Sequence, residues 1–257
     1  MTDKKKQLPP GVTLIALPHV SKHGFDPACV SSLIYGLIYS GLTKCLFNFY
    51  GDYPVSHARN AAAADAIAQG AEWVFFVDSD MDFPTNTLSR LKALDADIAC
   101  TDMWSRNWPS FRTVLEYDKG VRWPKKRQFV PVEGGGKVSG VRDVDCCGMA
   151  CTLIKTSLFR KFAKSKLMPF VMTQHGEDAG FCMVAKKKYR AKIRCDFDVV
   201  SGHWGRARMI GQDFTRDARN QFGLVADPEM LKRMGARNVD SNAARTEGAE
   251  EKHSTQT

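Results

Sequence analysis

Residues 72–84 read EWVFFVDSDMDFP, an apolar run that ends in closely spaced carboxylates. The apolar and mostly β-favouring residues 73–77 predict a buried strand. In an extended chain, Asp78 and Asp80 would lie on the same side. Ligands of open α/β sheets bind at the carboxyl ends of strands, and carboxylate oxygens suit Mg²⁺ or Mn²⁺. The stretch therefore predicts a metal site at a strand end, with a solvated turn as the alternative.

Strand and helix patterns alternate on both sides of this stretch. The predicted strands are 12–17, 45–49, 73–77, 97–101, 149–154 and 191–197, and the predicted helices begin near residues 26, 57, 85, 156 and 177. Such alternation is typical of an α/β fold, with a mixed but mainly parallel sheet and helices on both faces.

Residues 27–43 form the longest uncharged stretch of the chain. Asp26 fits the N-cap of a helix and Pro27 its first helical position. The apolar residues recur at helical spacing, which predicts a core-facing stripe rather than a membrane span: Val30, Leu33, Ile34, Leu37 and Ile38. We therefore expect no membrane insertion.

Length and composition fit one globular domain. The 257 residues are 44% hydrophobic and 25% charged, which are ordinary values for a protein with a sizeable core. The predicted domain covers 12–225, in two halves, 12–102 and 103–225. The segment 1–11 is predicted to be a flexible N-terminus without the apolar region of a signal peptide, and 226–257 to be a disordered tail. None of the eight cysteines forms a C-x-x-C pair, which argues against a structural zinc site.

The C-terminal half offers further candidate site residues. Glu177 and Asp178 follow Gly176 at the start of a predicted helix, where acids also serve to complement the helix dipole. A carboxylate here could alternatively act as a general base. His203 lies between Gly202 and Gly205 after a predicted strand, and its imidazole could be structural or could bind a metal.

Two segments together resemble GT-A-fold glycosyltransferases. They are HARNAAAADAIAQGAEWVFFVDSDMDFPTNTLSRL, from residue 57, and HGEDAGFCMVAKKKYRAKI, from residue 175. The similarity is strongest to the family 2-like inverting enzymes, of the short stand-alone kind found in bacteriophages, and it covers about residues 12–205. It implies an enzyme that moves a sugar from a nucleotide-diphosphate donor, UDP-linked, to an acceptor hydroxyl. Since neither a signal peptide nor a membrane span is predicted, we expect a cytoplasmic protein, in the host cytoplasm if phage-encoded.

The resemblance assigns roles to individual residues. It implies that Asp178 is the general base, with Glu177 in support. The D-x-D motif would hold the donor diphosphate and a divalent metal, Mn²⁺ or Mg²⁺. The metal ligands it implies are Asp78, Asp80 and His203, and the implied donor-binding residues are Pro18, His19, Arg59, Asn60, Asp78, Ser79, Asp80 and Arg106.

The charge of the chain bears on the acceptor. The formal net charge is +9, and residues 104–129 combine seven Lys or Arg and two acids with several aromatic side chains. This mixture suits phosphate contact and base stacking, so a hydroxymethylated pyrimidine in DNA is one predicted acceptor. A cell-envelope glycan, a small molecule or a merely solvated basic face are the alternatives. Outside this reaction class, strand-end acids also occur in metal-dependent nucleases and nucleotidyltransferases. The sequence does not indicate an oligomeric state.

Overall fold

The computed structural model describes residues 9, 11–19, 24–39, 44–51, 54–105, 112–117, 129–132, 138–204 and 209–210. All of them belong to one unit, Met1–Gln212. Of the predicted site residues, only Arg106 lies outside this set, together with most of the basic segment 104–129 and the predicted domain end at residue 225.

Most strands of the described chain join one mixed sheet. The strands are β1 (Thr13–His19), β2 (Cys45–Gly51), β3 (Trp73–Val77), β4 (Met81–Asp82), β5 (Ile98–Met103), β6 (Leu115–Tyr117), β7 (Phe129–Pro131), β8 (Val141–Asp143), β9 (Cys151–Lys155), β10 (Ile193–Trp204) and β11 (Met209–Ile210). Within the described residues, the sheet has the order β11-β10-β5-β9-β3-β1-β2, while β4 and β8 also pair with β10. Strands β6 and β7 form a separate small ladder.

The central strands are mainly parallel. Strand β1 is parallel to β2 and β3, and β10 is parallel to β5, whereas β9 lies antiparallel between β3 and β5. Residues 74–77 of β3 are at most 1% exposed, as expected for an apolar run covered on both faces. Since β3, β5 and β10 point the same way, their carboxyl ends meet at one edge of the sheet.

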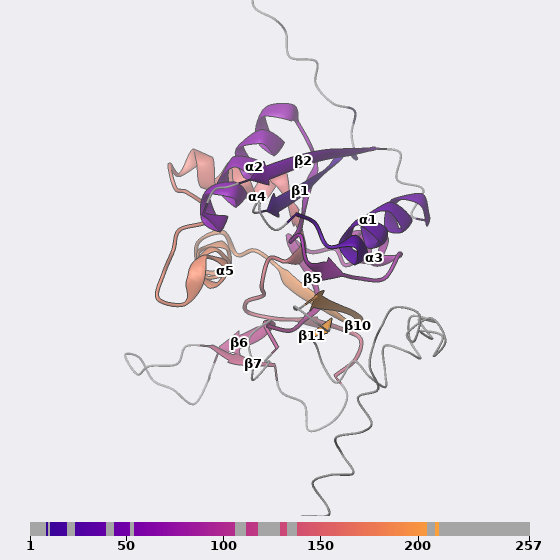
Figure 1. Cartoon of the computed structure of the whole chain (residues 1–257). Helices are drawn as coiled ribbons and strands as arrows, with labels where there is room; N and C mark the ends of the chain where they lie inside the picture. Colours follow the sequence, from indigo (N-terminus) through magenta and orange to yellow (C-terminus); the bar gives the residue numbers. More distant parts are fainter. Residues whose placement is uncertain are drawn as a thin grey trace, which may run out of the picture. The chain divides into compact units, whose positions relative to one another are not determined.

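Helices cover both faces of this sheet (Figure 1). They are α1 (Pro27–Tyr39), α2 (Val55–Gln69), α3 (Thr87–Ala93), α4 (Thr156–Lys164) and α5 (Gly176–Tyr189). Helix α2 contacts α4 and strands β1 to β3, while α3 packs against β5, β9 and β10. In the described residues, no helix combines the length and the apolar character needed to cross a bilayer.

Helix α1 starts as predicted but turns a different face to the core. The Asp26 carboxylate accepts a hydrogen bond from the Ala28 N–H (2.9 Å), which confirms the N-cap. The predicted stripe is confirmed at Leu33, which is 7% exposed, and is wrong at Val30 and Ile34, which are 40% and 51% exposed. The side chains of Leu37 and Ile38 lie outside the described part of the chain. The inward face combines Leu33 with the small residues Cys29, Ser32 and Gly36, and a Cβ on Gly36 would lie 3.3 Å from the Thr85 carbonyl oxygen. Close packing of small residues, which hydrophobicity alone does not reveal, sets the orientation of this helix.

Strand β10 is longer than predicted. The sequence placed His203 in a loop after a strand ending near residue 197, but β10 runs on to Trp204. Its last residues pair antiparallel with β4, so that His203 lies opposite Met81 and Gly202 opposite Asp82. A shift of register between Asp196 and Val200 re-aims this second half of the strand.

Candidate active site at the carboxyl edge of the sheet

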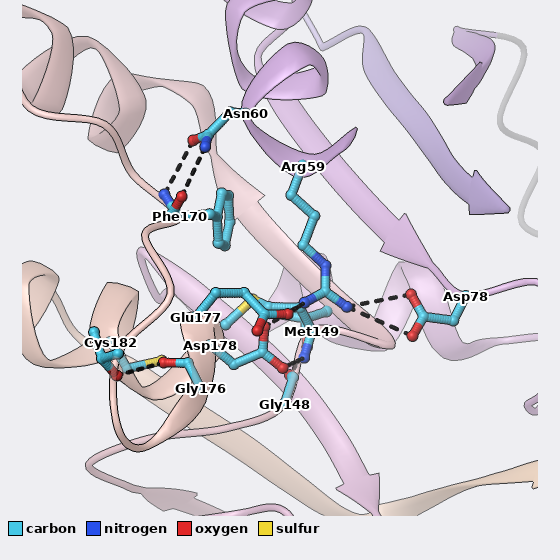
Figure 2. A network of polar contacts seen from close by, with 12 residues as sticks. Arg59, Asn60, Asp78, Gly148, Met149, Phe170, Gly176, Glu177, Asp178 and Cys182 are labelled. Carbon is cyan, nitrogen blue, oxygen red and sulfur yellow. Dashed lines mark hydrogen bonds and ion pairs between the residues drawn. The ribbon is translucent and has the colours of Figure 1, made fainter. Parts of the chain in front are cut away.

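One buried guanidinium gathers three of the predicted carboxylates (Figure 2). The Arg59 side chain is 4% exposed, and its Nη1 donates to Glu177 Oε1 at 2.6 Å and to Asp178 Oδ1. Its Nη2 lies 3.3 Å from Asp78 Oδ1. Burial lowers the pKa of Arg59, but the charges of the three acids outweigh that effect and raise it. Arg59 therefore stays cationic and ties the D-x-D segment to the start of α5.

The local sequence explains why an arginine can be buried here. Helix α2 presents alanines to the sheet at residues 58, 62, 63 and 66, which allows close approach and favours helix formation. Arg59 lies on the same buried side, near the beginning of the helix. The helix ends at Gly70, whose φ of 75° is the left-handed conformation of a C-cap.

Asp178 is held by two donors from different elements. While Oδ1 accepts from Arg59, Oδ2 accepts from the Met149 N–H at 3.1 Å. Burial raises the pKa of Asp178 to about 7; Arg59 opposes this rise, and Glu177 and Asp78 add to it. The side chain is still 27% exposed, so another molecule can reach it. A carboxylate that changes protonation near neutrality is suited to proton transfer.

These contacts bear on the helix-dipole alternative for Glu177 and Asp178. Both acids do occupy the first turn of α5, where the dipole favours negative charge. However, the N-cap residue His175 makes no capping bond, and both acids reach away from the helix to Arg59. Dipole complementarity alone would not require a shared buried cation.

The D-x-D segment is not extended. The chain turns directly after β3, where the Met81 N–H donates to the Asp78 carbonyl oxygen at 3.2 Å. The Ser79 carbonyl oxygen accepts from the Asp26 N–H at 2.9 Å, which joins this turn to the start of α1. The expectation that residues 78–80 continue the extended strand is therefore wrong, because β3 ends at Val77 and these residues form a turn.

His203 lies beside this turn because β10 pairs with β4. Its Nδ1 is 2.8 Å from the Trp104 carbonyl oxygen, which can only accept, so Nδ1 carries the hydrogen. In the neutral ring, the lone pair is then on Nε2, the arrangement common to metal-binding histidines. Within the described residues, no group of three or more His, Cys, Asp and Glu is arranged to hold a metal. A carboxylate oxygen and an imidazole nitrogen are nevertheless both suitable donors for a divalent ion, so the chemistry of Asp80 and His203 fits such a group.

A buried ion pair supports the backbone that holds His203. Arg112 binds Asp102 through Nε at 2.7 Å and Nη2 at 3.1 Å, and donates to the Val132 carbonyl oxygen at 2.6 Å. Its guanidinium also lies 5.0 Å from the centre of the Trp104 ring. Sequence reasoning missed this pair, because Asp102 reads as part of an apolar strand and its partner comes from the next loop.

The other predicted donor residues are spread along the same edge. Pro18 is buried near the end of β1, and His19 pairs with Gly51 of β2. Asn60 binds the Phe170 backbone twice, with its Nδ2 2.7 Å from the carbonyl oxygen and its Oδ1 3.0 Å from the amide nitrogen (Figure 2). Asn60 thus anchors the segment before α5, and a role in donor binding stays a prediction, as it does for Arg106 outside the described residues.

Sequence reasoning also missed the Met149 amide as a partner of Asp178. Gly148 was the available signal, since it precedes an apolar strand. A Cβ at Gly148 would lie 3.1 Å from Thr113 Oγ1 and 3.8 Å from Asp178 Oδ2. The absence of a side chain therefore lets the backbone come close to the carboxylate.

Comparison with known proteins informs the fold. No protein-family model and no curated protein matches this sequence. Among solved structures, A197 from STIV is similar with a TM-score of 0.51 and 17% identity, over 79% of this chain and 94% of A197. The predicted α/β fold class is confirmed.

Two further structures are similar at lower TM-scores. S. aureus TarS 1-349, crystallised in complex with UDP, has a TM-score of 0.44 and 15% identity over 74% of this chain and 60% of TarS 1-349. GalNAc-T7, crystallised with UDP, GalNAc and Mn²⁺, has a TM-score of 0.43 and 12% identity over 75% of this chain and 43% of its own. The described chain thus spans only part of these two larger proteins.

Proposed function

We propose that this protein is a metal-dependent, inverting glycosyltransferase of the GT-A type that uses a nucleotide-diphosphate sugar, UDP-linked, as donor. The observation that carries the proposal is the Arg59 cluster. It joins Asp78 of the D-x-D motif to the partly buried carboxylate of Asp178, whose pKa is raised to about 7, at the carboxyl edge of an α/β sheet. Ligands bind at this edge in open sheets of this class.

Asp178 supplies the base of the proposed reaction. The acceptor hydroxyl loses its proton to Asp178 as its oxygen attacks the anomeric carbon, and the nucleoside diphosphate leaves from the opposite side. Arg59 and the Met149 amide hold the two carboxylate oxygens and so fix the direction of the base. Glu177 shares the charge of Arg59 and thereby tunes the proton affinity of Asp178.

Asp78, Asp80 and His203 are the proposed protein ligands of Mn²⁺ or Mg²⁺. When bound, such an ion neutralises the charge that develops on the departing diphosphate. Ser79, Pro18, His19, Arg59, Asn60 and Arg106 complete the proposed donor site. A nuclease with two metal ions would need several acids to face the metals, whereas Glu177 and Asp178 both face Arg59.

Metal dependence tests this assignment. Release of nucleoside diphosphate from a panel of nucleotide sugars should stop in EDTA and return when Mn²⁺ or Mg²⁺ is added in excess. Asp80→Ala and His203→Ala should each lower turnover by roughly 10²-fold or more, because either change removes a ligand. Asp143→Ala, which removes an exposed carboxylate on β8, is the matched control and should remain active. Full activity of the wild type in excess EDTA would contradict the metal assignment.

The acceptor we propose to test first is hydroxymethylated DNA, with an envelope glycan as the alternative. The basic residues Lys125, Lys126 and Arg127, which carry this prediction, lie outside the described residues. Replacing all three with Gln should weaken DNA binding and lower the slope of log affinity against log salt by about 0.9 for each lost duplex contact. Donor hydrolysis without acceptor should not change. If the triple variant modified DNA as well as the wild type at all salt concentrations, the basic segment would be only a solvated face and not a DNA-binding site.

A further inference from the structure

The segment between α4 and α5 exposes aliphatic side chains of a kind that is usually buried in a folded protein. Leu167 is 39% exposed, Met168 59%, Val171 54% and Met172 63%. They come from six consecutive positions, whereas isolated exposed apolar residues are common on any surface. Contiguous exposure of this kind usually marks an interaction site.

Phe170 fixes this segment, which we term the apolar loop (residues 167–172). The Phe170 side chain is 1% exposed, and its ring lies 4.6 Å from that of Phe181 and 5.6 Å from that of Phe76. Its backbone is held by both ends of the Asn60 amide (Figure 2). Because Phe170 anchors the loop to the core, the exposed side chains on either side of it are held in a defined position.

Basic residues, and no acids, lie close to the apolar loop in the sequence. The sequence contains no Asp or Glu from residue 146 to residue 176. Four exposed basic residues precede or enter the loop: Arg160, Lys161, Lys164 and Lys166. Among the residues the structure describes, none of these four forms an ion pair. Their charge is therefore available to an anionic partner.

A mostly apolar hollow opens beside the loop. It has a volume of about 380 Å³ and lies between α2 and α4, with Ala63 and Ile67 on one side, Ala163 on the other and Leu167 and Met168 at its border. Such a hollow suits a hydrocarbon group better than a charged or planar one. The apolar loop and the hollow together offer an aliphatic surface next to positive charge that no described residue pairs.

We propose that the apolar loop and the basic face of α4 form a docking surface for an anionic lipid bilayer. Aliphatic side chains enter the boundary between headgroups and acyl chains, while the lysines and arginine lie among anionic headgroups. Nucleic acid would also attract the cations, but its binding sites use aromatic or polar side chains beside the charge rather than methionine, leucine and valine. The combination of aliphatic residues and unpaired cations therefore favours lipid.

Docking through the apolar loop would bring the candidate active site close to the membrane. The apolar loop is anchored by Asn60, the neighbour of Arg59, and the chain reaches Glu177 and Asp178 five and six residues beyond Met172. A docked protein would thus hold its candidate base close to the bilayer surface. The inference concerns binding alone and does not rest on the proposed transferase activity, since it is measured without donor or acceptor.

Vesicle co-sedimentation of the full chain tests the proposal. The wild type should bind vesicles of phosphatidylcholine mixed with phosphatidylglycerol, should bind pure phosphatidylcholine weakly, and should lose affinity as salt increases. Lys164→Gln/Lys166→Gln should lower the partition coefficient roughly fivefold per charge. Met168→Ser/Met172→Ser should lower it roughly tenfold or more, because two methionines no longer enter the bilayer.

Matched controls separate this surface from general effects of charge and hydrophobicity. Lys44→Gln/Arg142→Gln removes two exposed cations elsewhere, and Ile34→Ser/Val141→Ser removes two apolar side chains that are 51% and 47% exposed. Both controls should bind like the wild type, and circular dichroism should show that all four variants are folded. The proposal is overturned if the wild type ignores anionic vesicles or if the methionine variant binds them normally. It is equally overturned if DNA binding requires Lys164 and Lys166 while vesicle binding does not.

Discussion

Asp178→Asn is expected to lower turnover by roughly 10²-fold or more, because an amide cannot take the proton of an acceptor hydroxyl. The affinity for the donor should change little, since the donor is assigned to other residues. The fold should survive: Arg59 keeps Glu177 and Asp78 as partners, although Asn offers one acceptor oxygen where Asp178 offers two. The measurement is initial-rate kinetics with the identified donor and acceptor, with thermal unfolding as the control for folding.

The pH profile gives this prediction a second readout. Because the pKa of Asp178 is raised to about 7, the carboxyl is protonated below that pH and cannot act as a base. In the wild type, kcat/KM should therefore rise with pH through about 7, and this acidic limb should be absent from the residual activity of Asp178→Asn. Near-normal turnover of the variant, or the same acidic limb in both proteins, would return Asp178 to a structural role at the start of α5.

Arg59→Ala should cause the largest loss of stability, about 3 kcal/mol or more at neutral pH. The substitution leaves Asp78, Glu177 and Asp178 close together without their shared cation. Without Arg59, nothing opposes the rise that burial and the neighbouring acids cause in the pKa of Asp178, so this residue takes up a proton more readily in the folded variant than in the unfolded chain. The loss of stability should consequently shrink as the pH falls towards this raised pKa. Denaturant unfolding at several pH values measures both effects.

Two further variants define what Arg59 contributes. Arg59→Lys keeps the charge but loses the planar fork that reaches Asp78 and the α5 acids at once, so its stability should lie between the wild type and Arg59→Ala. Arg160→Ala removes an exposed arginine from α4 and should change the free energy of unfolding by no more than about 0.5 kcal/mol. A loss below about 1 kcal/mol in Arg59→Ala would show that the cluster is not a buried ion network.

The vesicle experiment also bears on the choice of acceptor. A protein that docks on an anionic bilayer through the apolar loop would meet acceptors at the membrane surface, which would favour an envelope glycan over DNA. DNA binding that depends on Lys125, Lys126 and Arg127 would favour the nucleic-acid acceptor. Because the two surfaces lie in different segments of the chain, the two sets of variants distinguish these outcomes.

The sequence by itself determined the local elements. An apolar run with high β-propensity, such as residues 73–77, favours a buried strand, so the central strands β1, β2, β3, β5 and β9 and the α/β class could be predicted. The short strands β4, β6, β7, β8 and β11 carry no such run and were not predicted. The starts of α1 and α5 could also be predicted. Helix-start signals lie within one turn of the residues they affect: Asp26 and Pro27 for α1, and the acids after Gly176 for α5. These features depend on neighbours in the chain, which the sequence displays directly.

Only the tertiary structure decided which side chains meet. Arg59 and Asp178 are 119 positions apart and share a hydrogen bond because α2 and α5 converge on the edge where β3 ends. His203 comes beside the D-x-D turn through a strand pairing that no local pattern indicates. Residue periodicity reports which face of an element is apolar, but it cannot report the partner across the sheet or a small-residue contact such as that of Gly36. Distances between residues far apart in the chain are set by packing, so the ion network, the raised pKa of Asp178 and the outward aim of the apolar loop follow from the fold and not from the sequence pattern.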